Sequence, residues 1–189
     1  MYLLEEDIAC ALDSLKNGGI ILYPTDTVWG IGCDATNAAA VAKIFALKKR
    51  ADTKSMIVLV PEEQWILNYV SAPAPTVVDY IKGISKPTTV IYDHAKNLAN
   101  NLVAADGSIA IRVCKANFAF QLMKAFGKPI VSTSANISGL PTPMCFKDIS
   151  IDILEGVDYV VKTEQDNTEL KQPSAIVKWE ANQLIVIRP

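Results

Sequence analysis

The amino-acid sequence predicts an α/β protein in which helices cover a mixed sheet. Helical and strand patterns alternate along much of the chain, which is typical of strands joined by crossover helices. The last part instead reads as two strands, 175–179 and 184–187, joined by Glu180-Ala181-Asn182-Gln183 as a hairpin. Because a hairpin pairs its strands antiparallel, we expect both parallel and antiparallel neighbours in the sheet.

The first elements have clear boundaries. Apolar residues at helical spacing from Ile8 to Leu15 stop at Asn17-Gly18-Gly19, where glycine supplies the left-handed backbone that ends a helix. A short apolar strand follows at 19–23. Asn37 can cap a second helix. The buried face of that helix is expected to use Val41, Ile44 and Phe45.

The rest of the chain continues this alternation. Further strands are predicted at 56–60, 88–92, 108–113, 129–133 and 159–162. Further helical segments are predicted at 62–69, 75–84, 116–126 and 147–154. The chain has 189 residues and half of them are apolar, which is enough for a sizeable core. We therefore expect one domain spanning residues 1–189.

Composition narrows the function classes. A formal charge of −2 argues against a general nucleic-acid coat but permits a local basic groove. The four cysteines, Cys10, Cys33, Cys114 and Cys145, are scattered, and His94 is the one histidine of the sequence. A zinc site therefore lacks ligands at the usual spacing, so no metal ligands are predicted, and the cysteines are expected to be buried free thiols.

The N-terminal residues, Met1-Tyr2-Leu3-Leu4-Glu5-Glu6-Asp7, have neither a basic stretch nor a long apolar run. No later segment reaches eighteen apolar residues, the length that a membrane-spanning helix needs. We expect a cytoplasmic protein that does not enter the membrane.

Several familiar motifs are absent or incomplete. The sequence has no Gly-Lys-Ser or Gly-Lys-Thr of a phosphate-binding loop. The segment Gly30-Ile31-Gly32-Cys33-Asp34-Ala35 resembles a dinucleotide fingerprint, but the acidic residue at the required distance is Asp52, which does not end a strand. His94 lies in a polar stretch without a nucleophile elbow, so it is expected to be a surface histidine. The scarcity of histidines favours chemistry based on positioning and charge neutralisation, such as nucleotidyl transfer, rather than on proton relays.

Two distant polar segments are suited to a nucleotide. The first is Tyr23 to Gly30, leading into Lys48-Lys49-Arg50, and the second is Ser132 to Asn136, at the end of a predicted strand. Each also has a purely structural explanation. The cations could simply end a helix in solvent, where the helix dipole favours them, and the Ser and Asn side chains could hydrogen-bond the backbone of their own turn. Tyr23, Pro24 and Trp29 fit either a cavity wall or the core.

Taken together, these segments resemble the YrdC family of threonylcarbamoyl-AMP synthases from Ile8 to Arg188. The signature Lys-x-Arg and Ser-x-Asn tetrad of the family corresponds here to Lys48, Arg50, Ser134 and Asn136. The further matching motifs are Tyr23 to Thr27, the Ile-x-Ile-Arg strand ending at Arg112, Ser138 to Thr142, Pro173 to Val177, and Arg188.

The resemblance implies a twisted mixed parallel/antiparallel sheet flanked by helices, with a concave positive cavity. It implies a nucleotidyltransferase that converts L-threonine, bicarbonate and ATP, the ATP with Mg²⁺, into threonylcarbamoyl-AMP and pyrophosphate for tRNA modification. The tetrad would be catalytic. The residues implied for ATP are Arg50, Lys54, Ser108, Ser134, Thr142 and Arg188. Those implied for threonine are Thr27, Arg112, Ser132 and Ser174. The pathway further implies a downstream threonylcarbamoyl transferase complex as a partner.

The sequence departs from the family pattern at four places: Ser55, Leu59, Cys114 and Ala175. None of these removes a charge from the expected site. Three alternatives remain: a YciO-like paralogue with another substrate, a module that binds double-stranded RNA or tRNA by its phosphates, and a carbamoyl-transfer enzyme related by fold. Binding by phosphates alone would weaken steeply with salt and would need no threonine.

Overall fold

The computed structural model describes residues 2–49, 56–180 and 183–189. The α-helices are α1 (Tyr2–Lys16), α2 (Ala38–Leu47), α3 (Ile66–Tyr69), α4 (Pro75–Gly83), α5 (Asn117–Phe126) and α6 (Ile151–Gly156). Two 3₁₀ turns are η1 (Glu63–Trp65) and η2 (Phe146–Asp148). The strands are β1 (Ile21–Tyr23), β2 (Gly30–Gly32), β3 (Ile57–Val60), β4 (Thr88–Tyr92), β5 (Ile109–Val113), β6 (Ile130–Ser134), β7 (Tyr159–Val160), β8 (Ala175–Glu180) and β9 (Gln183–Arg188).

The strands form one mixed sheet in the order β7-β1-β2-β6-β3-β5-β4-β8-β9. Parallel pairs are β1 with β7, β3 with β5, and β4 with β8. The other neighbours are antiparallel, including the C-terminal hairpin β8–β9. The mixed sheet predicted from the sequence is therefore confirmed.

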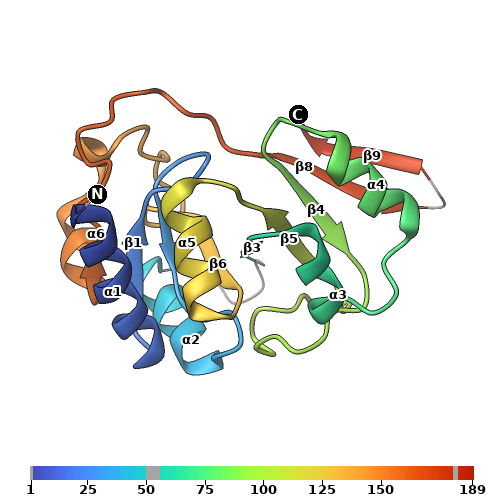
Figure 1. Ribbon diagram of the computed structural model, residues 1–189, viewed down its shortest axis with the longest axis horizontal. Coiled ribbons are helices and arrows are strands. Elements are labelled where there is room, and N and C mark those ends of the chain that lie inside the picture. Colours follow the sequence, from blue (N-terminus) through green and yellow to red (C-terminus); the bar gives the residue numbers. More distant parts are fainter. Residues whose placement is uncertain (1, 50–55, 181–182) are drawn as a thin grey trace.

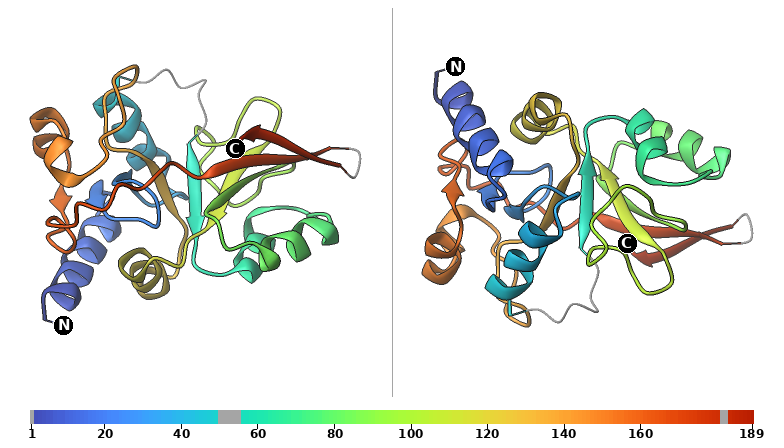
Figure 2. Two further views of the ribbon diagram at one scale, coloured as in Figure 1. Left: turned by 90° about the horizontal axis from the view of Figure 1, so that it is seen from above. Right: turned by 90° about the horizontal axis from the view of Figure 1, so that it is seen from below.

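Helices cover the two faces of this sheet unequally. Figure 2 shows α1, α3, α4 and α5 on one side of the strands and α2 on the other. The strands β4, β5, β8 and β9 thus have helices on one side, and the connection from β7 crosses the molecule to reach the start of β8 (Figure 1). The core between the layers includes Leu22, Ile44, Ile111 and Phe118, each at most 1% exposed.

Most element boundaries follow the local signals in the sequence. Gly18 adopts φ +69° after α1, and Gly127 adopts φ +71° after α5, as expected for glycines that end helices. The side chain of Asn37 accepts hydrogen bonds from the backbone N–H groups of Ala39 and Ala40, so the predicted cap of α2 is confirmed.

Some boundaries differ from the prediction. The predicted helix 147–154 is a 3₁₀ turn followed by the short helix α6, and the predicted strand 159–162 contains only Tyr159 and Val160. The predicted strand 129–133 continues through Ser134, so its hydroxyls lie within β6 and not after it. His94 is exposed, as expected, but Cys10 is exposed as well, so the expectation of a buried thiol is wrong there.

Strand β2 was not predicted, because its Gly-Ile-Gly sequence looks like a phosphate-binding turn. Both of its glycines are needed for close packing. A Cβ on Gly32 would lie 2.5 Å from the carbonyl oxygen of Val131 and 2.6 Å from the ring of Tyr23. A Cβ on Gly30 would lie 2.9 Å from the Ser132 hydroxyl. The glycines therefore serve strand pairing with β6, which argues against the dinucleotide fingerprint.

One buried carboxylate fixes the start of the connection from β7 to β8. Asp7 on α1 is 0% exposed and accepts hydrogen bonds from the Tyr159 hydroxyl, the Lys162 N–H, and both the N–H and the hydroxyl of Thr163. Burial alone would raise the pKa of Asp7, but these hydrogen bonds outweigh it and lower that pKa. The charged form is therefore the one that holds this segment to α1.

In the part of the chain that the structure describes, no helix combines the length and the apolar character needed to cross a membrane.

We predict that Gly32→Ala lowers the free energy of unfolding by about 1–3 kcal/mol, because the new methyl group would collide with backbone that cannot move freely. Chemical denaturation monitored by circular dichroism measures this change. Gly83→Ala is the control, since a Cβ there meets nothing within 4 Å. Equal stabilities of the two variants would show that β2 and β6 separate easily.

Candidate active site

A cavity of about 270 Å³ opens on one face of the sheet. Its floor is formed by side chains that alternate along the strands, such as Ala110 and Arg112 on β5, because every second residue of a strand faces the same side. The loop after β1 and the segment before β8 complete its walls. The polar residues that line it are Thr27, Arg112, Ser132, Thr133, Ser134, Thr142, Ser174 and Arg188.

The structure thus brings together all four residues predicted for threonine and, of those predicted for ATP, Ser134, Thr142 and Arg188. Ser108 does not line this cavity: it precedes β5, at the end opposite to Arg112, and its N–H donates to Asp106. Arg50 and Lys54 lie outside the described residues. The departure at Ser55 lies outside them as well.

Lys48 follows α2 and is 1% exposed, so the alternative of a solvated helix end is wrong for this residue. Its ammonium group donates hydrogen bonds to the backbone carbonyl oxygens of Ser134 and, at 2.6 Å, of Asn136. In return, the carbonyl of Lys48 accepts from the N–H of Ser138 at 2.8 Å. Lys48 therefore ties the end of α2 to the turn that follows β6.

Asn136 completes this turn. Its amide nitrogen donates to the carbonyl oxygens of Leu140 and Ile137, and its amide oxygen accepts from the Ser134 hydroxyl at 2.6 Å. The structural explanation for the Ser-x-Asn segment is thus correct for Asn136, whose side chain bonds the turn. Ser134 nevertheless lines the cavity, and it must turn its proton away from Asn136 in order to donate to a ligand.

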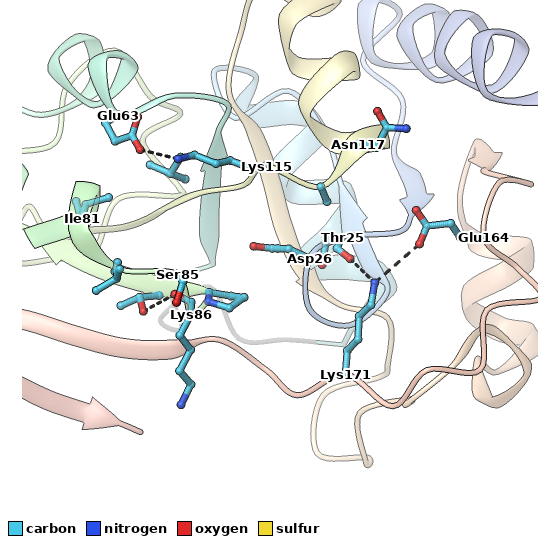
Figure 3. A pocket seen from close by; sticks show the side chains of 15 residues that line it. Thr25, Asp26, Glu63, Ile81, Ser85, Lys86, Lys115, Asn117, Glu164 and Lys171 are labelled. Carbon is cyan, nitrogen blue, oxygen red and sulfur yellow. Dashed lines mark hydrogen bonds and ion pairs between the residues drawn. The ribbon is translucent and has the colours of Figure 1, made fainter. Parts of the chain in front are cut away.

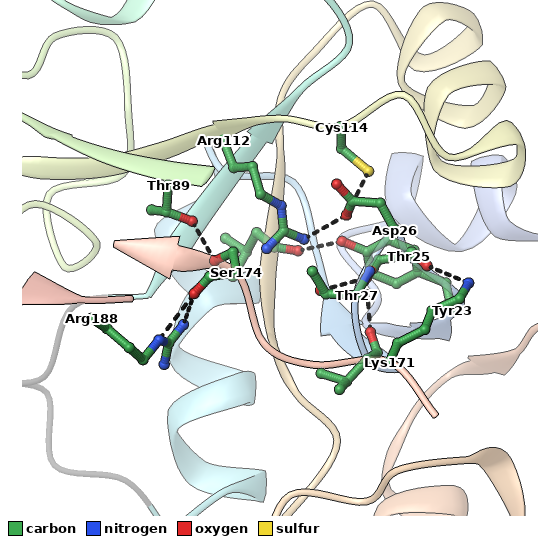
Figure 4. A network of polar contacts seen from close by, with 12 residues as sticks. Tyr23, Thr25, Asp26, Thr27, Thr89, Arg112, Cys114, Lys171, Ser174 and Arg188 are labelled. Carbon is green, nitrogen blue, oxygen red and sulfur yellow. Dashed lines mark hydrogen bonds and ion pairs between the residues drawn. The ribbon is translucent and has the colours of Figure 1, made fainter. Parts of the chain in front are cut away.

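Arg112 is the most deeply buried charge of the cavity, at 3% exposure. Its Nη2 atom lies 3.0 Å from Oδ1 of Asp26, and the same oxygen accepts from the Cys114 thiol at 3.3 Å (Figure 4). Nε of Arg112 is buried and has no hydrogen-bond partner among the residues that the structure describes. The ion pair leaves this guanidinium able to bind a second anion.

Arg188 and Ser174 form the opposite wall. Nε and Nη2 of Arg188 donate to the carbonyl oxygen of Ser174 at 3.0 and 2.8 Å, and the Ser174 hydroxyl lies 2.8 Å from that of Thr89. Burial, and then the positive charge of Arg112, lower the pKa of Arg188. Since the partner of Arg188 is a neutral carbonyl, this arginine keeps its full positive charge for a ligand.

The hydroxyl of Thr27 faces the cavity as an acceptor. The Thr25 hydroxyl donates its single proton to the carbonyl of Val28 at 2.8 Å. The contact of 3.0 Å between the hydroxyls of Thr25 and Thr27 must then use the proton of Thr27. Thr27 therefore offers lone pairs to a donor such as an amine or a hydroxyl group.

The aromatic side chains divide between core and wall. Tyr23 is 0% exposed and donates to the Val131 carbonyl at 3.1 Å, so it belongs to the core. Burial raises its pKa above the ordinary value. Trp29 lines the cavity and packs on Phe146 with ring centroids 4.9 Å apart. Pro24 does not line this cavity.

No acidic residue lines the cavity among those that the structure describes, while two arginines do. Nor do three or more His, Cys, Asp or Glu side chains gather as a metal site would require, within residues 2–49, 56–180 and 183–189. The donors present, two guanidinium groups and several hydroxyls, suit oxyanions such as phosphate and carboxylate.

Sequence reasoning missed the role of Asp26, which lies within the quoted Tyr23–Thr27 motif. The available signal was Arg112: an arginine in an apolar strand is buried, and a buried charge needs a partner. The carboxylate of Asp26 also lines a second cavity of about 400 Å³, on the α4 and α5 side of the sheet. Figure 3 shows Asp26 in that cavity, with Lys115 and Lys171 on either side.

Comparison with known proteins relates this arrangement to a family. A family model for the Sua5, YciO and YrdC proteins, described as telomere recombination, matches residues 13–189. The chain belongs to this family. Its relatives include the threonylcarbamoyl-AMP synthases of Pseudoalteromonas translucida, at 34% identity over 83% of this chain and 86% of that protein, and of Methylococcus capsulatus, at 38% identity over 68% and 70%.

Solved structures of the family share the fold. The structure of P. abyssi Sua5 complexed with L-threonine has a TM-score of 0.86 at 20% identity and covers 96% of this chain. This chain spans 53% of that protein, about half of its length. E. coli YciO has a TM-score of 0.82 at 21% identity, over 98% of this chain and 89% of that chain. The predicted sheet flanked by helices is thus the fold of the family.

We predict that Lys48→Met lowers the free energy of unfolding by about 1–3 kcal/mol, because it leaves buried carbonyl oxygens of the turn without a donor. Thermal or chemical denaturation measures the loss. Lys43→Met, within α2, is the matched control, since the exposed Lys43 also donates to one backbone carbonyl, that of Gly18. A loss no larger than that of the control would mean that the turn holds its shape without Lys48.

Proposed function

We propose that the protein is a threonylcarbamoyl-AMP synthase, which forms threonylcarbamoyl-AMP and pyrophosphate from L-threonine, bicarbonate and ATP. The observation that carries this proposal is a cavity with two arginines, several hydroxyls and no acidic residue among its described lining. Two relatives that bear the name of this enzyme support it. A cavity of this kind suits a nucleotide and an amino-acid carboxylate together.

The two substrates would occupy neighbouring parts of the cavity. Arg112, Ser132, Ser174 and Thr27 are proposed to bind threonine, with Arg112 on its carboxylate and Thr27 accepting from its amine or hydroxyl. Ser134, Thr142 and Arg188 are proposed to bind ATP. Ser132 and Ser134 face the same side of β6, about 7 Å apart, so substrates bound at these two hydroxyls would be adjacent.

The reaction needs positioning and charge neutralisation rather than a protein nucleophile. The threonine amine attacks bicarbonate and water leaves; an oxygen of the resulting carbamate attacks the α-phosphorus of ATP, and pyrophosphate leaves. Every reacting group is an anion or becomes one, so the guanidinium groups of the cavity favour their approach. Mg²⁺ would enter with ATP, held by phosphate oxygens, since the described lining offers it no carboxylate.

Lys48 and Asn136 would then act through the backbone, by shaping the turn that presents Ser134. The proposed ATP contacts of Arg50 and Lys54 concern residues outside the described ranges, and that of Ser108 would need a ligand that reaches beyond this cavity. A role in tRNA modification, with transfer of the product to a downstream complex, would follow from the same activity.

The decisive experiment incubates the protein with ATP, Mg²⁺, bicarbonate and each amino acid in turn, and measures pyrophosphate. We expect release that depends on threonine and a threonine-specific adenylate in the product. Omission of bicarbonate should abolish both. Pyrophosphate release without any threonine dependence would favour a YciO-like role, and salt-sensitive RNA binding without turnover would favour the binding module.

We predict that Arg112→Ala lowers kcat/KM for threonine roughly 10²-fold, the size of effect that follows loss of one preorganised charge contact, and changes the KM for ATP less. Arg188→Ala should instead affect the kinetics with ATP more than those with threonine, because Arg188 is assigned to the nucleotide. Steady-state kinetics with each substrate varied in turn separate the two. Arg112→Lys checks that unfolding is not the cause, since it keeps a positive charge beside Asp26.

A further inference from the structure

Arg112 requires a partner that its own sheet does not supply. Its neighbours across the strands are Leu59 on β3 and Thr89 on β4, and neither carries a charge. The carboxylate comes instead from Asp26, in the connection between β1 and β2. An arginine at 3% exposure would be costly without this carboxylate, because burial removes the water that stabilises its charge.

The geometry points to a further role for Asp26. We propose that Asp26 is a positioning residue, which fixes the orientation of the Arg112 guanidinium so that its remaining N–H groups face the carboxylate of the amino-acid substrate. This inference rests on the proposed function and assigns a part in substrate recognition to a residue that does not line the cavity itself.

The contact between the two residues leaves most of the guanidinium free. The printed ion pair joins Nη2 of Arg112 to Oδ1 of Asp26 at 3.0 Å, and Nε keeps its proton without a described partner. A guanidinium has five N–H donors, and a carboxylate that is bound in the usual paired manner takes two of them. Asp26 can therefore bind the Nη2 group while a substrate carboxylate binds two of the remaining N–H donors.

Asp26 is itself held in place from both sides. The Cys114 thiol donates to its Oδ1 atom, and burial followed by the negative charge of Asp26 raises the pKa of that thiol to about 11, so it stays a neutral donor at pH 7. On the other side, the hydroxyl of Thr25 accepts from the N–H of Thr27 and donates to the carbonyl of Val28. These bonds stiffen the turn that carries both Asp26 and Thr27.

The same stiff turn thus serves both ends of the amino acid. Thr27 presents an acceptor to the cavity. Asp26, one residue earlier, orients the Arg112 guanidinium, which donates to the substrate carboxylate. Because the turn is held by its own hydrogen bonds, the two contacts keep a fixed separation before substrate arrives. Such preorganisation favours ligands whose donor and carboxylate match that spacing, as in an α-amino acid.

The test compares Asp26→Asn with Glu63→Gln. Both replace a carboxylate with an amide in the second cavity, and the two carboxylates are alike in exposure and in ion-pair distance: Asp26 is 19% exposed and 3.0 Å from Arg112, and Glu63 is 21% exposed and 3.1 Å from Lys115. For Asp26→Asn we expect the KM for threonine to rise about tenfold or more, the effect of a weakened charged hydrogen bond, and the KM for ATP to stay within about twofold. Glu63→Gln should change neither KM.

Asp26→Glu is a second variant that separates the positioning role from a folding defect, should Asp26→Asn fold poorly. It keeps the charge but moves the carboxylate by one methylene, so the KM for threonine should rise while the melting temperature stays near that of the unmodified protein. A double-mutant cycle with Arg112→Lys adds a readout that a purely structural role would not move: the effect of Asp26→Asn on the KM for threonine should shrink when Arg112 is already replaced.

An unchanged KM for threonine in Asp26→Asn, or full additivity in the cycle, would overturn the role of Asp26 and leave the proposed function intact. Equal rises in both KM values, with a matching fall in melting temperature, would also overturn it, since they would indicate a general loss of structure. A lack of threonine-dependent turnover in the unmodified protein would overturn both proposals together.

Discussion

The arrangement of this protein depends on strand β6, which hydrogen-bonds to β2 along one edge and to β3 along the other. The two ladders are displaced: β3 pairs with residues 130–132 and β2 with residues 133–134. The strands on either side of β6 are therefore joined through consecutive segments of this one strand. Ser132 is the last residue of the β3 ladder and Ser134 belongs to the β2 ladder, and the absence of a side chain on Gly30 leaves room for the Ser132 hydroxyl. The same constraint that joins the sheet also places the polar groups of the cavity.

Three cations at or beside the cavity are stabilised in different ways, and the difference bears on function. Lys48 and Arg188 donate to neutral backbone carbonyls, whereas Arg112 is paired with a carboxylate. A carbonyl satisfies hydrogen bonds without cancelling charge, so Arg188 contributes a positive potential to the cavity. Asp26 reduces the charge of Arg112 but fixes its direction. The uncancelled charge of Arg188 suits the several negative charges of nucleotide phosphates, whereas the oriented guanidinium of Arg112 suits a single carboxylate.

Local signals were sufficient for much of the fold but for less of the site. The cap at Asn37 and the helix end at Gly18 depend on neighbouring residues, so they could be read from the sequence. Strand β2 could not, because the nearest contacts of its two glycines, the Val131 carbonyl and the Ser132 hydroxyl, come from β6, more than 90 residues away along the chain. Motif resemblance found most of the polar residues that line the cavity. It gave no role to Asp26, whose importance appears only when Arg112 is seen to be buried beside it.

The cavity is assembled from strands that are far apart along the chain. Residue 88 on β4 pairs with residue 175 on β8, which brings Ser174 and Arg188 to the site. At about 5–20 residues per second, a ribosome needs roughly 4–17 seconds to synthesise the stretch between them. During that time the edge of β4 has no partner strand, and the arginine that would hold the nucleotide does not yet exist. A nascent chain therefore cannot use substrate binding to stabilise itself, and its open sheet edge is where a chaperone would be most useful.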